Sequence, residues 1–352
     1  MRTVVRIAAY IPSTVVDEVP AGAPDEDEFT LGATAAERVW IGRHEAPGAL
    51  AVHLLGEFPA AADWGFAPLL GRETEAVVRH TGTAAELGAT LRALEEGSGG
   101  PALAVASELP ERTRARAEKS SAIGAAAVAY LLEEVDEPSP LPLPKLPATR
   151  NAVGATLRLM GSPKAVPRSV TFIGDWDRPP GAGRTMDSKL LRKAEEANLG
   201  AVAEGAYVPR PRYLENLPSR WRFLAELCGA CHGTTFPARG VCRHCGRSDA
   251  LTLLPLPHDG GRVVAITTVG KGGQPTEFDG QVEALGAYDV ALVELARGRR
   301  VTLQVSDAVP GTLRVGDHVD TRLRRLYPME GEWRYGRKAV PSRTSPRRET
   351  GG

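Results

Sequence analysis

Cysteine is scarce in this 352-residue chain, which has four cysteines and none before Cys228. The residues that precede Cys228 therefore offer no thiol for nucleophilic chemistry. Long apolar runs are also missing, since none approaches the roughly 18 residues that a membrane-spanning helix needs. Residues 1–5 are too short an opening to be a secretory signal, so we expect a cytoplasmic protein in a reduced setting.

An excess of either charge is missing as well, because 43 basic side chains balance 43 acidic ones. The balance is uneven along the chain: residues 1–206 carry 21 basic and 28 acidic side chains, whereas residues 207–352 carry 22 and 15. A mildly basic second half suits a phosphate-bearing ligand or an acidic partner. It falls short of the concentrated basic patch of a dedicated nucleic-acid-binding protein, and most of these charges are expected to be solvated.

The four cysteines form two C-x-x-C pairs, Cys228 with Cys231 and Cys242 with Cys245. Each pair supplies two sulfurs at a fixed spacing, and the intervening loop folds one pair over the other around a tetrahedral ion, which predicts zinc. Rubredoxin-type iron and two disulfides are the alternatives. Nothing else in the sequence indicates an electron carrier, and disulfides do not fit a reduced setting. Since four thiolates leave no coordination position for water or substrate, the predicted zinc is structural.

The first half alternates short apolar runs with helix-like periods, which predicts a layered α/β domain. The expected strands are 4–11, 49–55 and 102–106, with another buried element at 124–132. The expected helices are 30–39, with Thr30 as its amino-terminal cap, and 83–95. A stiff proline-rich linker follows at 138–144, then a strand at 170–173 and a charged helix at 186–197.

The second half begins with apolar residues at helix-like intervals in 209–227, where Pro218 is expected to split the run into two short helices. After the cysteines come short strands. They are expected at 262–269, at 290–295 and 301–305 as a hairpin, at 318–326 and at 333–339. Five such strands with polar turns predict a small closed barrel of the OB type.

This second half resembles a known family. The resemblance rests on 213–221, the paired cysteines with Phe236-Pro237-Ala238-Arg239 between them, Gly261-Arg262-Val263, the 290–295 strand and Val315-Gly316-Asp317-His318-Val319. Together these segments resemble the zinc-ribbon OB-fold family that accompanies thiolase-like enzymes, over residues 207–341. The resemblance implies a non-catalytic accessory protein that binds acyl-CoA or bridges acyl-CoA enzymes, as in the archaeal thiolase and hydroxymethylglutaryl-CoA synthase assembly. Relatives also occur in steroid-degrading hydratase and aldolase complexes.

The first half resembles a shortened archaeal hydroxymethylglutaryl-CoA synthase. The matching segments are Ala9-Tyr10-Ile11-Pro12, Pro24-Asp25-Glu26-Asp27 with Thr30-Leu31, Gly124-Ala125-Ala126-Ala127-Val128 and Asp175-Trp176-Asp177-Arg178-Pro179. The region is too short for a complete thiolase fold with its two repeated halves. Such enzymes carry the acyl group on a cysteine at a helix amino terminus. Here the corresponding helix begins near Thr81-Gly82-Thr83 without a cysteine, which implies a pseudoenzyme that keeps a surface for assembly.

The expected fold is thus a truncated thiolase-like α/β domain, then a rubredoxin-like zinc ribbon and an all-β OB-fold barrel. The expected division is a degenerate synthase-like domain at 1–137, a linker with a remnant of that domain at 138–206, a helical lead at 207–227, the ribbon at 228–248, the barrel at 249–341 and a disordered tail at 342–352.

Arginines and aromatics near the ribbon are candidate ligand contacts. Arg239, Arg243 and Arg247 suit the phosphates of CoA because guanidinium groups pair with phosphate oxygens, although surface solvation is the default. Trp221 and Phe223 either line a pantetheine path or pack in the core.

Histidines and acidic residues are the remaining candidates. His44, His53 and His80 are expected to be structural rather than catalytic. His232 and His244 lie within the metal loop, but the complete cysteine set makes them unnecessary as ligands. Residues 25–27 either bind a cation or form a solvated loop at a helix entry, which we favour.

Three functions compete. The leading hypothesis is a non-catalytic scaffold that holds a thiolase and a synthase in a hetero-oligomer and aids transfer of a CoA thioester. The second is a nucleic-acid-binding module, since zinc ribbons and OB barrels bind single strands through stacked aromatics, of which the barrel strands have few. An active acyltransferase or hydrolase is the third, and it lacks a nucleophile with a recognisable base.

Overall fold

The computed structural model describes most of the two halves of the chain. The described residues are 2–12, 14–16, 19–20, 23–40, 49–72, 74–80, 84–97, 100–108, 126–135, 170–174, 184–185, 189, 193, 208–255, 260–329 and 331–342. The proline-rich linker expected at 138–144, and all of the helix expected at 186–197 except Lys189 and Lys193, lie outside them. The chain divides into two compact units, Met1–Arg192 and Lys193–Gly352. The finer boundaries expected from the sequence remain predictions.

The amino-terminal unit is built on a six-stranded mixed sheet in the order β5-β4-β6-β7-β1-β8. Its strands are β1 (Arg2–Tyr10), β4 (Leu50–Leu55), β5 (Thr74–His80), β6 (Ala102–Glu108), β7 (Ala126–Glu134) and β8 (Thr171–Gly174). Strands β5, β4 and β6 run parallel, whereas β7 is antiparallel to both of its neighbours. A small second sheet joins β2 (Thr14–Val16), β3 (Val19–Pro20) and β9 (Arg184–Thr185).

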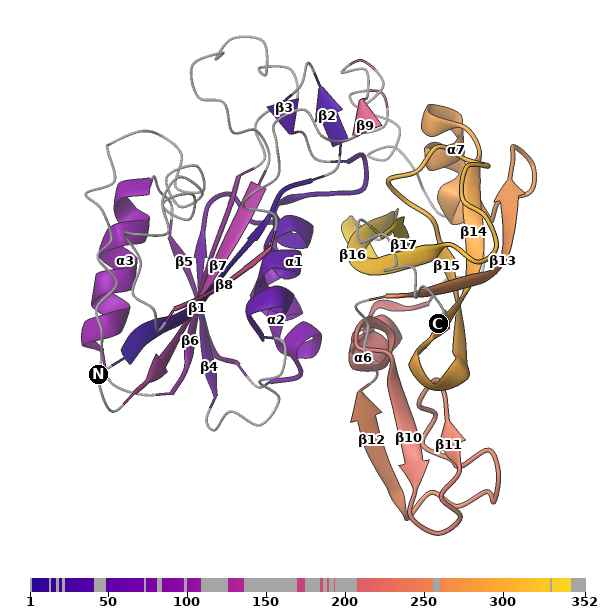
Figure 1. Cartoon of the computed structure of the whole chain (residues 1–352), viewed down its shortest axis with the longest axis horizontal. Helices are drawn as coiled ribbons and strands as arrows, with labels where there is room; N and C mark the ends of the chain where they lie inside the picture. The colour runs from indigo at the N-terminus through magenta and orange to yellow at the C-terminus, as the bar shows by residue number, and fades with distance from the viewer. Residues whose placement is uncertain are drawn as a thin grey trace, which may run out of the picture. The chain divides into compact units, whose positions relative to one another are not determined.

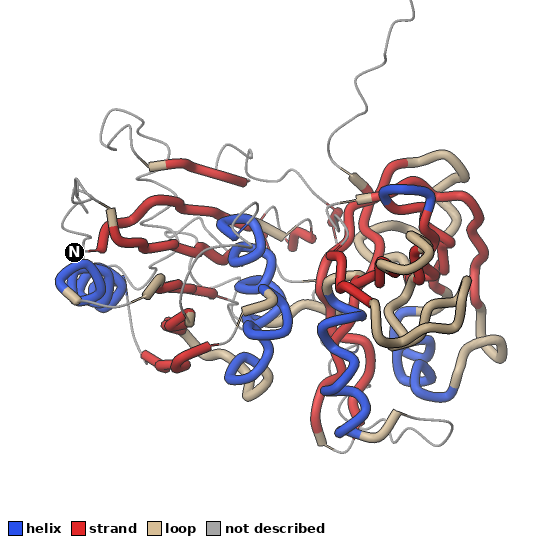
Figure 2. The backbone as a smooth tube through the Cα atoms, turned by 90° about the horizontal axis from the view of Figure 1, so that it is seen from below, coloured by secondary structure: helices blue, strands red, loops and turns tan. Residues whose placement is uncertain are grey.

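Helices cover both faces of the large sheet (Figures 1 and 2). They are α1 (Glu28–Trp40), α2 (Ala62–Leu70) and α3 (Ala84–Glu96). Leu87, Leu91 and Leu94 of α3 pack on small and branched residues of β6 and β7, whereas α1 lies against the opposite face, where a side chain at Gly32 would meet Val105. The predicted layered α/β domain is confirmed, and α2 and β5 are elements that the sequence reading missed.

The start of α1 corrects two expectations. Asp27, not Thr30, is the cap: the Thr30 backbone N–H donates to Asp27 Oδ1, and the Asp27 N–H donates to Thr30 Oγ1, each at 2.9 Å. This reciprocal pair is a capping box, and it places Thr30 inside the helix. The acidic loop is also not solvated. Glu26 is fully buried, where it accepts a hydrogen bond from the Tyr10 hydroxyl at 2.6 Å and one from the Ala23 N–H at 2.8 Å.

The carboxy-terminal unit begins with α6 (Arg210–Trp221), a single helix with Pro218 inside it. The expected division into two helices is therefore wrong. A proline within a helix costs about 3 kcal/mol, but tertiary contacts hold this helix on both sides of the proline. Tyr213 and Trp221 both donate to the Tyr335 carbonyl at 3.1 Å, and the Tyr335 N–H donates back to the Tyr213 hydroxyl at 2.8 Å.

A five-stranded antiparallel sheet forms most of this unit, in the order β15-β14-β13-β16-β17. Its strands are β13 (Gly261–Val269), β14 (Tyr288–Leu295), β15 (Arg299–Gln304), β16 (His318–Met329) and β17 (Glu332–Pro341), with η2 (Thr276–Phe278), α7 (Asp279–Leu285) and η3 (Ala296–Gly298) in the connections. The predicted hairpin of β14 and β15 is confirmed. Among the described residues, Val305, which directly follows β15, forms one parallel bridge with Ala339 of β17. Five strands are thus confirmed, whereas a closed OB barrel is not established.

The ribbon is a separate three-stranded sheet in the order β11-β10-β12. Its strands are β10 (Leu224–Cys228), β11 (Thr234–Thr235) and β12 (Leu251–Pro255). Between residues 228 and 250, only Cys228, Thr235 and Cys242 are buried. This segment therefore has almost no apolar core of its own. Among the helices that the structure describes, none has the length and apolarity to cross a membrane.

Candidate metal centre

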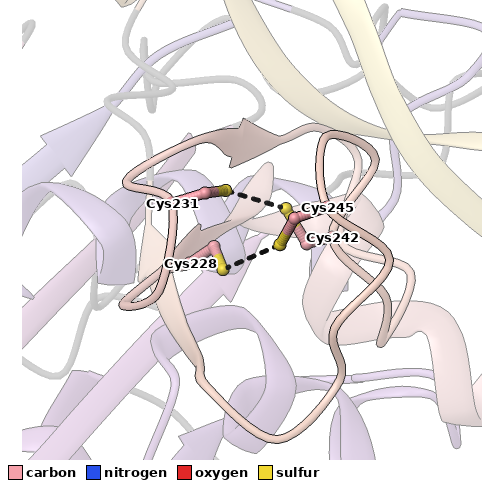
Figure 3. A group of neighbouring side chains, drawn as sticks. All are labelled: Cys228, Cys231, Cys242 and Cys245. Carbon is pink, nitrogen blue, oxygen red and sulfur yellow. Dashed lines mark hydrogen bonds between the residues drawn. The ribbon is translucent and has the colours of Figure 1, made fainter.

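The four cysteine thiols meet at one end of the ribbon sheet (Figure 3). All four Sγ atoms lie within 4.8 Å of one another. Cys228 Sγ lies 3.7 Å from Cys245 Sγ, and Cys231 Sγ lies 3.6 Å from Cys242 Sγ. Each close pair joins one buried and one exposed cysteine, and each crosses from one C-x-x-C segment to the other.

The two C-x-x-C segments have the same backbone hydrogen bonds. The His232 N–H donates to the Cys228 carbonyl at 2.8 Å, and the Gly246 N–H donates to the Cys242 carbonyl at 2.9 Å. Both donors have positive φ, 55° at His232 and 74° at Gly246. These turns bring the second sulfur of each pair back beside the first. Each segment therefore presents its two sulfurs close together, within 4.8 Å.

Backbone N–H groups also point at the sulfurs. The N–H groups of Cys245 and then His244 lower the pKa of the Cys242 thiol to about 6. In the other segment, the N–H of Cys231 is the main cause of a lowered Cys228 pKa. Hydrogen bonds of this kind stabilise thiolates, and the thiolate is the form that binds metal.

The arrangement fits a tetrahedral ion. Zinc–sulfur bonds of about 2.3 Å give a tetrahedron whose sulfur–sulfur edges are about 3.8 Å long. The two short pairs, at 3.6 and 3.7 Å, have nearly that spacing. Bound there, a zinc ion would have Cys228, Cys231, Cys242 and Cys245 as its four ligands and would act as a structural link between the two segments.

Glu226 supports the loop between the two segments, and the sequence reading missed it. Its carboxylate is buried in β10 and accepts hydrogen bonds from the Arg239 N–H at 2.9 Å and the Gly240 N–H at 2.7 Å. Thr235 Oγ1 holds the second segment in the same way by accepting from the Arg243 N–H at 3.0 Å. An acidic residue within the apolar run Leu224–Cys228 was the available sequence signal for this role.

The three candidate arginines are all exposed on the ribbon. Arg247 is paired with Asp249, whose carboxylate it contacts at 2.7 Å and whose pKa it lowers. Arg239 and Arg243 use their backbone N–H groups in the contacts above. Within the described part of the chain, their guanidinium groups have no acidic partner.

The remaining candidates take structural positions. Trp221 and Phe223 are buried, with Phe223 in the apolar cluster of the five-stranded sheet, so core packing was the correct alternative. His244 lies against Gly233, where an added Cβ would come within 2.4 Å of its ring. His44 lies outside the described residues. His53 and His80 are not isolated: their nitrogens Nδ1 and Nε2 lie 3.1 Å apart on neighbouring strands.

Two curated proteins are similar to part of this chain. A DUF35 domain-containing scaffold protein of Methanothermobacter thermautotrophicus is 31% identical over 121 residues, which cover 34% of this chain and 85% of that protein. The chain belongs to the DUF35 family. Another DUF35 domain-containing scaffold protein, from Methanocaldococcus jannaschii, is 27% identical over 132 residues, or 37% of this chain and 89% of that protein. No protein-family model matches the chain.

Solved structures resemble parts of this DUF35 protein more distantly. The Ltp2-ChsH2(DUF35) aldolase covers 39% of this chain and 98% of its own, at 21% identity and a TM-score of 0.29. PksG, a HMG-CoA synthase from Bacillus subtilus, covers 40% of this chain and 42% of its own, at 18% identity and a TM-score of 0.32. At these TM-scores neither structure bears on the function of this chain.

Proposed function

We propose that this protein is a non-catalytic accessory subunit that holds thiolase-superfamily enzymes together during the handling of a CoA thioester. The observation that carries the proposal is the closed set of four cysteines in a chain whose curated DUF35 relatives are named scaffold proteins. A metal with four protein thiolates has no open position for a substrate. All four cysteines are used in this way, so no thiol is left for acyl transfer.

The zinc ion in this proposal replaces an apolar core. A segment with three buried residues between 228 and 250 cannot be stabilised by hydrophobic burial alone. Metal binding to the four preorganised cysteines supplies that free energy. The ribbon then presents an ordered, mostly exposed surface to a partner.

The partner assignment follows from the resemblance of residues 1–206 to a synthase without its cysteine. The chain keeps the buried sheet although it lacks the nucleophilic cysteine. We explain this by a surface of the unit that still docks on related enzymes. In this proposal Arg239 and Arg243 contact the phosphates of the CoA thioester, because Arg247 is already paired with Asp249. We also propose that the five-stranded sheet forms an OB-type barrel, closed where Val305 bridges to Ala339.

Aromatic burial argues against the nucleic-acid alternative. Stacking on bases needs exposed rings beside a basic groove. Tyr288 and Tyr335 are buried, and the ring of Trp333 is covered by the guanidinium of Arg325, 4.5 Å from its centroid. Tyr327 lies against Phe278, with ring centroids 5.6 Å apart. These rings pack within the unit and do not form a platform.

Light scattering after size-exclusion chromatography tests the proposal. The zinc-loaded chain is run alone and with the thiolase and the hydroxymethylglutaryl-CoA synthase of the same source, at low and high salt. We expect a hetero-oligomer that persists in both buffers, since a stable interface of more than about 1,000 Å² has an apolar centre. A chain that binds neither enzyme but shifts with an oligonucleotide at low salt would refute the scaffold and favour nucleic-acid binding.

A further inference from the structure

Strand β13 has a free edge along its second half. It pairs with β16 only at Gly261 and Arg262, and the backbone of Val263 makes the last hydrogen bonds on that side, with Asp317 and Gly316. From Ala265 to Val269 the strand pairs with β14 alone. Alternate N–H and C=O groups of these residues therefore point away from the sheet without a described partner.

The free edge is of the kind that accepts another strand. Proteins usually protect such edges with charged residues or proline. Residues 264–269 include neither, and Ala265, Thr267 and Thr268 are exposed. The edge thus keeps unpaired backbone groups accessible.

The loop between β15 and β16 forms the opposite wall of a groove along this edge. The groove has a volume of about 460 Å³. Its lining includes Thr268 of β13, Asp289 of β14 and, from the loop, Gly311, Leu313, Arg314 and Val315. Val315 is 63% exposed and is among the most exposed large apolar side chains of the described residues. The loop is fixed in place, because the Gly311 N–H donates to Asp289 Oδ2 at 2.8 Å.

Charge at the groove favours an acidic occupant. Arg314 is exposed in the lining, and the Arg262 guanidinium lies beside Gly316 at the same end. The two nearby carboxylates are already used: Asp289 accepts from Thr268 Oγ1 and the Gly311 N–H, and Asp317 accepts from the Arg314 N–H at 2.8 Å. These donors are neutral, so both carboxylates keep their negative charge, but Asp289 is buried. The exposed charges at this end of the groove are Arg262, Arg314 and Asp317, an excess of one positive charge.

We propose that this groove receives an extended segment of the thiolase-superfamily partner, which adds a strand to the edge of β13 and places a carboxylate near Arg314. Strand addition obtains its affinity from backbone hydrogen bonds and its specificity from neighbouring side-chain contacts. Here Leu313 and Val315 provide the apolar contact, and Arg314 provides the charge. The proposal rests on the proposed function, since it names where that partner binds.

Partner binding by matched variants tests the groove. Val315→Asp introduces a charge into its lining, and Val309→Asp makes the same change in the same loop, at a residue that is 54% exposed but does not line the groove. We expect Val315→Asp to weaken binding of the full zinc-loaded chain by about tenfold or more, and Val309→Asp to change it by less than about twofold. Arg314→Gln removes the charge and should weaken binding by about threefold to tenfold.

Hydrogen exchange of the complex tests strand addition directly. Among residues 264–270, the amides that point away from β14 should exchange rapidly in the free protein and become protected when the partner binds, whereas those that donate to β14 should be protected in both states. If the wild-type chain binds its partner while Val315→Asp binds as tightly as Val309→Asp and the exchange of 264–270 is unchanged, the groove is not the site, although the scaffold function stands. If the wild-type chain binds no thiolase-superfamily enzyme, both proposals fail.

Discussion

The amino-terminal sheet and the ribbon differ most in how much of each is buried. Strands β6 and β7 are buried almost throughout, in a sheet with helices on both faces. In the ribbon, by contrast, nearly every residue from 228 to 250 is accessible to solvent. Apolar burial contributes roughly 25 cal/mol per Å², which stabilises the large sheet and is scarcely available to the ribbon. The first region therefore depends on side-chain packing, and under the proposed function the second depends on metal ligation.

Zinc removal should produce the largest difference in stability between the two regions. A chelator, or Cys242→Ser, should unfold residues 224–255, because structural zinc contributes about 10–16 kcal/mol to folding in isolated zinc-binding peptides. We expect one zinc per wild-type chain by metal analysis and rapid amide exchange throughout the ribbon after chelation. Exchange in β6 and β7 should not change.

The control for this experiment is Ser248→Ala, an exposed ribbon position that is not a ligand. It should retain zinc and protection. Native protein that contains iron with rubredoxin-like absorption, or no metal at all, would contradict the assignment.

Removal of a core leucine should produce the converse result. Leu91 is fully buried in the apolar cluster between α3 and the large sheet. Leu91→Ala should destabilise the amino-terminal unit by about 2–5 kcal/mol, because it leaves a cavity, while zinc content stays the same. Urea unfolding followed by helical circular dichroism measures this effect. Leu253→Ala, at a ribbon leucine that is 58% exposed, should stay within about 0.5 kcal/mol of wild type.

The link between α6 and β17 should have an intermediate effect. The Tyr213 hydroxyl accepts from the buried Tyr335 N–H and donates to the Tyr335 carbonyl, which Trp221 also contacts. Tyr213→Phe leaves the N–H without this partner but leaves the carbonyl paired, so we expect a loss of about 1–3 kcal/mol in the carboxy-terminal unit. Tyr327→Phe is the matched control, because the described contact of Tyr327 is with the ring of Phe278. Equal losses in the two variants would show that the hydroxyl bonds of Tyr213 contribute little.

Local patterns predicted what depends on local chemistry. The C-x-x-C spacing places two sulfurs on one tight turn, so the cysteine cluster could be expected from the spacing alone. Apolar periodicity likewise predicted α3 and the hairpin of β14 and β15, because each is formed by neighbouring residues. The missed helix α2 contains Gly65 and Pro68, which interrupt a helical pattern in the sequence.

Contacts between distant residues could not be predicted in this way. Pro218 stays within one helix because Tyr335, more than a hundred residues later, holds both sides of it. Asp27 and Thr30 exchange two hydrogen bonds at the start of α1. The sequence shows both polar residues but not which of them precedes the helix and caps it. Glu226 is conspicuous as an acidic residue in an apolar run, but its partners are backbone N–H groups, which have no sequence signature and so do not reveal which loop it supports.

The smallest expected effect concerns His53 and His80, which link β4 to β5 at the edge of the large sheet. Burial, then the neighbouring His80 and Arg2, lowers the pKa of His53 to about 4. Because the unfolded chain binds this proton near pH 6.5 and the folded chain does not, the stability from neutral His53 is complete above pH 6.5 and is lost as the pH falls toward 4. Amide exchange of β4 and β5 should therefore increase over this range, modestly because His53 is half exposed. His53→Gln should flatten the response, whereas His318→Gln, at an exposed position in the other unit, should not. If His53→Gln shows the same acid response as the wild type, other groups destabilise this edge, and the histidine pair is only a packing contact.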